Sequence, residues 1–430
     1  MKPIVVSAAL AGLTLGAAQA QTMPAEITEP VTITWYNYNL ASAGNGADAT
    51  RHLIDLFEAA HPNIHVEGVP VPPQNITTRV QADLVAGQQV DLVQVTFNAL
   101  GFAAEALGAH ALEDIVPAAE LAANFEGMVQ NGLDLGRIDG RTYALAYTFS
   151  TPVLYYNADI FRQVGLDPEN PPQTWAQIAE AGRVIRDHSD HIPLASGMFG
   201  PSAGDWLMQG VLRSNNGGVI NADRTAMTFA DPASLEAVQM LRDLAQEGIL
   251  VNLDVTSQLE SMAAGNAAMY LQTSAVQGYL IRGAEGNYDL RATTMPGFGD
   301  LRPRPNNSGS GLAIFSQDPA RQRAAWELMK FVTSNEGYTI ITRDIGYLPL
   351  RMAVVESPEY LAGWVSEHPL LQPNLQQLSY LEPWTPMPGP NYVQIATTMM
   401  DAIEMAVFGD NDDVAGILTA AQTQTQGLLP

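Results

Sequence analysis

The sequence predicts an α/β protein of two lobes, each built on a mainly parallel sheet with flanking helices. The chain has 430 residues, 47% of them hydrophobic, and a single core rarely grows beyond about 250 to 300 residues. Strand and helix patterns alternate after residue 30, as is typical of parallel sheets. Two strand-like runs also meet with only a short break at 150–152. Such a break is expected where a chain passes from one lobe to the other.

The first twenty residues have the pattern of a secretory signal peptide. Lys2 supplies a positive charge, residues 4–15 are apolar, and Ala18-Gln19-Ala20 forms a small-residue cleavage site. The apolar stretch is well short of the roughly 20 residues that span a bilayer. Because the chain contains no cysteine, we expect neither a lipid anchor nor a disulfide. The mature protein is predicted to be periplasmic and to begin near Gln21.

The chain is strongly acidic. Its 45 acidic and 20 basic residues give a formal charge of −25. Repulsion at this charge disfavours nucleic acids and anionic membrane surfaces as partners. It also opposes an anionic ligand, although a local basic cluster can act within a Debye length of about 8 Å. We expect a monomer with no nucleic-acid partner.

The first part of the mature chain alternates strands and helices. Apolar residues alternate with polar ones in the strands and recur every three or four positions in the helices, and Pro62 ends the first helix. The predicted order is a strand at 31–35, a helix ending by residue 61, a strand at 64–69, a helix at 77–85 and a strand at 90–95. This β-α-β-α-β order favours a parallel sheet with helices on both faces.

Candidate binding residues follow these three strands. Ligands of open sheets bind beyond the carboxyl ends of the strands. The segments there contain Tyr38, Asn75 and Phe97, and aromatic rings with amides suit a ligand that carries hydroxyl groups. Ordinary loop composition is the alternative for each residue.

A hairpin precedes the break between the lobes. Asp139-Gly140 predicts a type I′ turn because both residues tolerate positive φ. A strand at 143–147 follows, and Pro152 interrupts the strand pattern before it resumes at 153–156.

The rest of the chain alternates further helices and strands. Thr174 and Gln177 have the spacing of a capping box. Helices are predicted after Asp231-Pro232 and Asp318-Pro319, strands at 267–271, 290–295 and 312–315, and a helical region with proline breaks at 352–430.

Several strings resemble extracellular solute-binding proteins, most closely the branch that binds glycerol-3-phosphate within the wider sugar-binding group. They are Ser-Thr-Pro-Val-Leu-Tyr-Tyr-Asn at 150–157, Gly-Leu-Asp-Pro at 165–168, Pro-Pro-Gln-Thr-Trp at 171–175, Gly-Ser-Gly-Leu-Ala-Ile at 309–314 and Gly-Tyr-Leu-Pro at 346–349. The resemblance covers nearly all of the mature chain. It implies the periplasmic binding protein fold, with three hinge crossings near 147–152, 292–296 and 345–349. The N-terminal lobe would hold 21–147 and 294–345, and the C-terminal lobe 148–293 and 346–430.

The resemblance also implies further ligand-binding residues. They are Ser150, Trp206, Ser274, Gly309 with the adjacent Ser310, and Tyr347. The alternatives are turn chemistry for the serines and simple packing for the tryptophan and the tyrosine.

The chain departs from the glycerol-3-phosphate branch at three places. That branch has a tyrosine near Asn75, a glutamate near Phe97, and an arginine about where Pro390-Asn391-Tyr392 stands. An arginine forks onto phosphate oxygens, so its absence removes the obvious anion anchor. The possible substitutes are Arg302, Arg304 and Arg351.

The function implied is the substrate-binding component of an ATP-driven (ABC) importer. It would capture a sugar, a polyol, glycerol-3-phosphate or a glycerophosphodiester by lobe closure and deliver it to a membrane permease, with no cofactor. The sequence contains no cysteine nucleophile and no Gly-x-Ser-x-Gly motif, and Gly309-Ser310-Gly311 precedes a strand, so it is not a phosphate-binding loop. We therefore predict no enzyme activity.

A periplasmic metal-capture protein and a two-lobed hydrolase or lyase remain as alternatives. The candidate metal ligands are weak, because Pro62 separates His61 from His65 and residues 187–191 match ligand spacings only loosely. Residues 410–413 lack the glycine and distal glutamate of a calcium loop.

Overall fold

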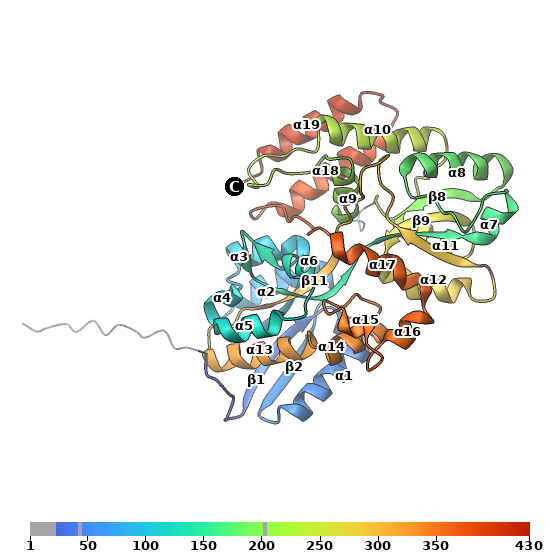
Figure 1. Cartoon of the computed structure of the whole chain (residues 1–430). Coiled ribbons are helices and arrows are strands. Elements are labelled where there is room, and N and C mark those ends of the chain that lie inside the picture. The colour runs from blue at the N-terminus through green and yellow to red at the C-terminus, as the bar shows by residue number, and fades with distance from the viewer. Residues whose placement is uncertain (1–22, 42–44, 201–203) are drawn as a thin grey trace, which may run out of the picture.

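The protein has two α/β lobes, each with its own sheet (Figure 1). The computed structural model describes residues 23–41, 45–200 and 204–430. The predicted signal peptide lies outside these residues. Within them, no helix combines the length and the apolar character that crossing a bilayer requires.

The sheet of the first lobe has the order β2-β1-β3-β11-β6. Its strands are β1 (Val31–Asn37), β2 (Ile64–Pro70), β3 (Leu92–Thr96), β6 (Leu145–Ser150) and β11 (Ser308–Ile314). β1 pairs in parallel with β2 and β3, which confirms the predicted β-α-β-α-β unit. β11 pairs antiparallel with both β3 and β6, so it alone runs against the other four strands.

The sheet of the second lobe has the order β10-β7-β9-β8. Its strands are β7 (Pro152–Asn157), β8 (Ile192–Ser196), β9 (Ala267–Thr273) and β10 (Leu290–Thr294). β8 and β9 are parallel, and β7 lies antiparallel between β9 and β10. Each sheet is therefore mainly parallel with one reversed strand, as expected for mixed α/β lobes.

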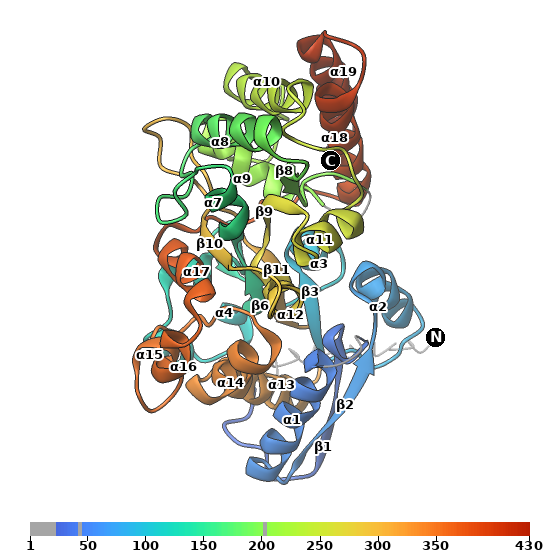
Figure 2. The same cartoon turned by 90° about the vertical axis from the view of Figure 1, so that its right-hand side faces the viewer.

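Helices cover both sheets (Figures 1 and 2). Those of the first lobe are α1 (Asn45–Ala60), α2 (Ile76–Val85), α3 (Leu100–Ala106), α4 (Leu112–Ile115), α5 (Ala118–Phe125), α6 (Gln130–Asp134), α13 (Pro319–Val332) and α14 (Asn335–Ile340). Those of the second lobe are α7 (Ala158–Gln163), α8 (Trp175–His188), α9 (Trp206–Ser214), α10 (Pro232–Gln246), α11 (Val255–Ala263), α12 (Gln277–Ala284), α18 (Tyr392–Phe408) and α19 (Val414–Gln426).

Local signals in the sequence set several of these boundaries. The Thr174 hydroxyl accepts a hydrogen bond from the Gln177 backbone, and the reciprocal bond completes the predicted capping box of α8. Asp139 and Gly140 have φ values of 48° and 79° in the hairpin of β4 (Arg137–Ile138) and β5 (Arg141–Thr142). Asp413 caps α19 by accepting from the Gly416 N–H at 2.8 Å.

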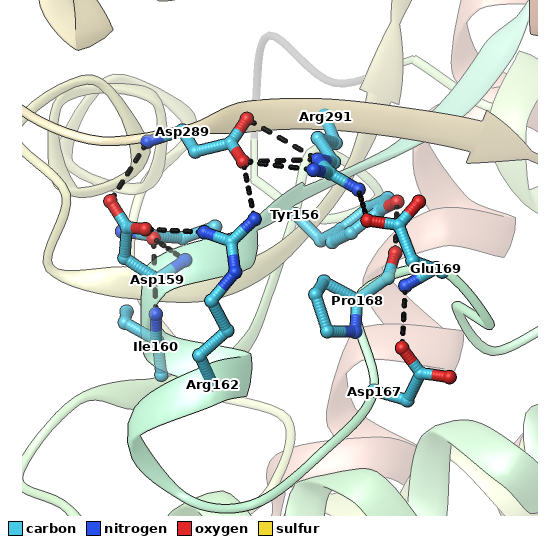
Figure 3. Close-up of polar contacts among 10 residues, drawn as sticks. Tyr156, Asp159, Ile160, Arg162, Asp167, Pro168, Glu169, Asp289 and Arg291 are labelled. Atoms are coloured by element: carbon cyan, nitrogen blue, oxygen red, sulfur yellow. Dashed lines mark hydrogen bonds and ion pairs between the residues drawn. The ribbon is translucent and has the colours of Figure 1, made fainter.

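Polar contacts fix the first motif of the resemblance within the second lobe (Figure 3). The Tyr156 hydroxyl on β7 donates to the carbonyl of Pro168 at 2.9 Å. Asp289 lies between Arg162 and Arg291 and pairs with both. These contacts therefore hold the motif strand β7 to the turn at Pro168, and α7 to the start of β10.

The first two connections between the sheets are direct. Only Thr151 separates β6 from β7, and residues 295–307 join β10 to β11. The predicted hinge at 292–296 thus overlaps the end of β10.

The third connection differs from the predicted hinge at 345–349. The Arg351 guanidinium donates to the carbonyls of Asn124, Glu126 and Thr333 in the first lobe, at 2.7 to 2.8 Å. α15 (Ala353–Glu356) also lies beside α14, and α16 (Ala362–Ser366) lies beside α15 (Figure 2). The chain reaches the second sheet only at the short turn Pro369–Leu371, which contacts β10, and at α17 (Gln372–Gln377), which contacts β7 and β10. The predicted boundary is therefore too early.

Candidate functional site

A cavity of about 430 Å³ lies between the two lobes. Its lining residues are Tyr38, Asn39, Ala41, Gly46, Pro72, Pro73, Gln74, Ala275, Ile345 and Tyr347. Most of them follow strands β1 and β2 of the first lobe, while Ala275 follows β9 of the second lobe. We call this space the tyrosine cavity. It lies beyond the carboxyl ends of β1 and β2, where open sheets place their ligands.

Two of the predicted residues, Tyr38 and Tyr347, line this cavity. The Tyr38 backbone N–H donates to Oε1 of Gln94 at 3.0 Å, and its hydroxyl lies 2.9 Å from the Thr148 hydroxyl. Burial raises the pKa of both tyrosines, and the neighbouring Tyr38 raises the pKa of Tyr347 further. Both side chains therefore stay neutral and present hydroxyl groups and ring faces.

A buried polar network lies behind Tyr38. The Gln94 amide on β3 donates to the hydroxyls of Ser310 and Thr148 at 2.9 and 3.1 Å. Those two hydroxyls share a hydrogen bond of 2.7 Å. The predicted Ser310 is fully buried in this network and does not line the cavity. Ser310 lies beneath Tyr38 instead, as part of the network that holds the Tyr38 side chain in position.

Gln94 and Thr148 were not predicted as site residues. The signal in the sequence that could have identified them is that these polar side chains occur inside the apolar strands β3 and β6. Buried polar groups are normally hydrogen bonded, so a polar residue in such a strand predicts a partner. The sequence does not say which partner.

Gly309 has a backbone role. Its φ is 114°, and an added Cβ would lie 2.0 Å from the carbonyl oxygen of Thr148. Only glycine fits this close approach between β11 and β6. The residue lies next to the polar network but does not line the cavity.

The two predicted serines lie where the lobes meet. The hydroxyls of Ser150 and Thr273 share a hydrogen bond of 2.5 Å, which joins β6 of the first lobe to β9 of the second. The Ser274 hydroxyl is buried without a hydrogen-bond partner, and its neighbour Ala275 lines the tyrosine cavity. Since an unpaired buried hydroxyl is costly, Ser274 is a candidate ligand contact.

The other three predicted residues lie elsewhere. Asn75 is exposed at the start of α2, and its neighbour Gln74 lines the cavity instead. Trp206 is buried in the hydrophobic core and lines neither of the two cavities described here. Phe97 lines the second cavity.

The second cavity measures about 280 Å³ and also contains residues of both lobes. Phe97, Asp134, Arg137 and Asp139 come from the first lobe; Arg224 and Trp384 come from segments beside the second. We call it the tryptophan cavity. It combines two aromatic side chains with charged groups of both signs.

The arginines considered as phosphate anchors are engaged away from both cavities. Arg302 lies 4.0 Å above the ring of Tyr380, and Arg304 pairs with Glu382. Arg351 is bound to three backbone carbonyls, as described above. Where the glycerol-3-phosphate branch has its arginine, Tyr392 stacks on Phe102 of α3 at 5.7 Å.

The histidines named as weak metal ligands face different partners. His61 stacks on Phe57 at 4.5 Å, and His65 pairs with Glu58 at 2.9 Å. In the part of the chain that the structure describes, no three His, Asp or Glu side chains are grouped so that they could hold a metal ion.

Comparison with known proteins decides the family. The family described as bacterial extracellular solute-binding protein matches residues 52–372. The chain belongs to this family.

A solute-binding relative, the sn-glycerol-3-phosphate-binding periplasmic protein UgpB of Pectobacterium atrosepticum, is 29% identical over 226 residues. The match covers 50% of this chain and 50% of the relative, so the chain spans about half the length of the curated relatives it matches.

Solved structures of solute-binding proteins share the fold. The cyclic alpha-maltosyl-1,6-maltose binding protein of Arthrobacter globiformis has a TM-score of 0.81 at 23% identity, covering 93% of this chain and 99% of that one. UgpB of Mycobacterium tuberculosis in complex with glycerophosphocholine has a TM-score of 0.79 at 21% identity, covering 93% and 98%. These likenesses establish the two-lobed fold.

Proposed function

We propose that the protein is the periplasmic substrate-binding component of an ABC importer. It captures a small polyhydroxylated solute, of the class of sugars, polyols, glycerol-3-phosphate and glycerophosphodiesters, and delivers it to a membrane permease. The observation that carries this proposal is that the tyrosine cavity takes lining residues from both lobes of a solute-binding family member. The protein acts as a monomer in the periplasm, after removal of the signal peptide and without a lipid anchor.

The mechanism is closure of the lobes around the solute. A solute in the tyrosine cavity contacts Tyr38 and Tyr347 on one side and Ala275 of the second lobe on the other. It makes both sets of contacts only when the lobes are shut, so it favours the closed state by its differential affinity. The lobes move about the three connections at Thr151, 295–307 and 367–371. No bond is made or broken in the solute, and ATP is hydrolysed by the transporter.

The chemistry of the tyrosine cavity fits a hydroxylated solute. The rings of Tyr38 and Tyr347 can cover apolar C–H surface, and their neutral hydroxyls can donate and accept hydrogen bonds. Gln74 adds an amide that does both. The unpaired Ser274 hydroxyl is buried behind the lining residue Ala275, its neighbour in the chain.

A thermal-shift screen of the mature chain with sugars, polyols, glycerol-3-phosphate and glycerophosphodiesters tests the proposal. Ligand at a hundredfold excess over Kd stabilises the folded state by about 2.7 kcal/mol. We expect at least one of these compounds to raise the melting temperature. The Tyr347→Ala variant should lose that shift, whereas Tyr279→Ala, at an exposed site on α12, should keep it. A shift only with amino acids or peptides would show that the solute class is wrong.

A further inference from the structure

We propose that α3 of the first lobe and two segments of the second lobe form a clasp that holds the lobes together in the absence of solute. The clasp consists of the ion pair between Arg224 and Glu105 and the ring stack between Tyr392 and Phe102. It goes beyond the proposed function, because it sets how far the free protein is already shut before a solute arrives.

One face of α3 lies against the second lobe. Glu105 accepts hydrogen bonds from Nη1 of Arg224 at 3.1 Å and from the backbone N–H of Gly389 at 3.4 Å. Phe102 stacks on Tyr392, the first residue of α18, with the ring centroids 5.7 Å apart and 28° between the ring planes. Figure 1 shows α3 at the edge of the first lobe that faces the segment leading into α18. These contacts join the lobes away from the three chain connections.

Gly101 allows α3 to approach the second lobe this closely. An added Cβ at this position would lie 2.9 Å from Nη2 of Arg224 and 3.5 Å from the ring of Pro386. The shorter of these distances would force the guanidinium to move. Glycine is a poor helix former, so its presence inside α3 favours the close contact at the expense of the helix.

The loop that carries Arg224 holds this residue in a strained conformation. Arg224 has a φ of 57°, in the left-handed region that residues other than glycine rarely adopt. The side-chain oxygen of Asn221 closes the loop by accepting from the N–H groups of Thr225 and Ala226 at 2.8 and 3.0 Å. Strain of this kind persists only where the surrounding structure imposes it, and it is common at functional positions. Here the strained residue is the one that reaches the other lobe.

Helix α19 fixes the same loop to the second lobe. The Gln426 side chain, at the end of α19, accepts from the backbone N–H of Met227 at 2.9 Å and donates to the carbonyl of Thr225 at 3.0 Å. The loop therefore moves with the second lobe, whereas Glu105 moves with the first. Separation of the lobes must break the contact between them.

The clasp is weak enough to open. Nε and Nη2 of Arg224 are buried without an acceptor, which is unfavourable, and the Glu105 side chain is 40% exposed, so water weakens the ion pair. The unfavourable burial ends when the lobes separate and water reaches the guanidinium. The clasp therefore shifts the equilibrium towards the closed form without locking it. A solute that binds the closed form then has to supply less of the free energy of closure.

Single-molecule fluorescence energy transfer on the mature chain, without any solute, tests the clasp. Because the chain contains no cysteine, Val85→Cys on α2 and Met405→Cys on α18 place one dye at an exposed site of each lobe. Figure 2 shows α2 and α18 across the molecule from α17, so the distance between the dyes grows as the lobes open. The ratio of closed to open molecules is then read directly.

We expect the parent chain to populate both forms and Glu105→Gln to lower the ratio of closed to open molecules about fivefold, as for the loss of a partly exposed ion pair. Glu247→Gln is the matched control. It removes the same charge from an ion pair with Arg183 at 2.6 Å, and both members of that pair belong to the second lobe. The ratio should stay unchanged in this variant.

Two further variants break the clasp without removing a carboxylate. Arg224→Gly relieves the strained φ and deletes the guanidinium, so the ratio of closed to open molecules should fall. Asn216→Gly is its control, because Asn216 has a φ of 61° at an exposed position of the same lobe. Gly101→Ala should stabilise α3 as a helix and still lower the ratio, because the added Cβ displaces the guanidinium. A role in helix stability alone would have the opposite sign.

Three outcomes would overturn the clasp. One is a parent chain that is entirely open without solute. Another is a ratio of closed to open molecules that neither Glu105→Gln nor Arg224→Gly lowers. The third is an equal fall in the ratio with Glu247→Gln, which would trace the effect to the loss of a surface charge. Because no solute is present, these outcomes leave the proposed function to its own thermal-shift test.

Discussion

The hydroxyl of Thr151 donates a 2.7 Å hydrogen bond to Oδ1 of Asn374, although 223 positions separate the two residues. Thr151 is the only residue between β6 and β7, and Asn374 lies on α17. Gln377 of α17 donates to the same Thr151 hydroxyl at 3.0 Å and accepts from the backbone of Met295 at the start of the second connection. One buried network therefore joins all three connections between the lobes.

Replacing Thr151 with valine should destabilise the protein. Valine keeps the shape but leaves the Asn374 oxygen buried without its donor, at a cost of about 1 to 3 kcal/mol. Urea unfolding measures the change. Thr423→Val is the control, because the exposed Thr423 hydroxyl bonds only the carbonyl of Thr419 in its own helix. Equal stability of the two variants would contradict a structural role for the network.

Replacing Gly309 with alanine should destabilise the first lobe. The φ of 114° and the 2.0 Å approach to the Thr148 carbonyl leave no space for a Cβ. Backbone strain alone costs about 1 to 3 kcal/mol, and displacement of β11 would disturb Ser310. Gly363→Ala in α16, where an added Cβ meets nothing within 4 Å, should be neutral or stabilising. A Gly309→Ala protein with an unchanged melting temperature would show that β11 can shift freely.

Glu120 should make the stability of the first lobe depend on acidic pH. Burial alone would raise the pKa of this carboxyl, but hydrogen bonds from Lys330, Arg323 and Trp326 outweigh it and lower the pKa from 4.5 to about 2. Because the folded-state pKa is the lower one, the stabilisation is complete above about pH 4.5 and is lost as the pH falls towards 2.

The Glu120→Gln variant measures this contribution. It should be about 1 to 3 kcal/mol less stable than the parent at pH 7, and the difference should shrink between pH 4.5 and 2. Urea unfolding at several pH values gives the comparison, with Glu260→Gln at an exposed position of α11 as the control. A difference that stays constant over this range would rule out the ionised carboxylate as its source.

Solute binding should make the protein more compact. If the solute joins the two lobes, small-angle scattering should give a smaller radius of gyration with saturating solute than without it. Tyr347→Ala at the same solute concentration should keep the larger value. Identical scattering with and without bound solute would exclude closure as the response.

Local signals predicted most of the fold. Pro62, the capping box at Thr174 and the Asp139-Gly140 turn each act over a few residues, and the elements that they delimit are in the structure. The third connection was misplaced because the break near Tyr347 does not end the first lobe. Arg351 binds back to carbonyls more than 200 positions earlier, and no local pattern shows such a contact.

The residues of the candidate site were harder to predict, because contacts between residues far apart in the sequence again decide where they lie. Tyr38 and Tyr347 follow structural breaks that the sequence shows. Trp206 and Trp384 both lie in the buried core, and Asp205 and Asn307 orient the Trp384 indole and backbone from distant positions. The sequence shows two tryptophans of equal chemistry, and it does not show that Trp384 lines a cavity whereas Trp206 lines neither of the two described above.

Because the lining of the tyrosine cavity carries no formal charge, we expect the affinity for the solute to depend little on the salt concentration outside the cell. Salt screens attraction between charges but has little influence on hydrogen bonds between neutral groups. The affinity for the solute should therefore stay nearly constant when the medium outside the cell changes from dilute to saline. A receptor with this lining would scavenge nutrients equally well in fresh and in brackish water.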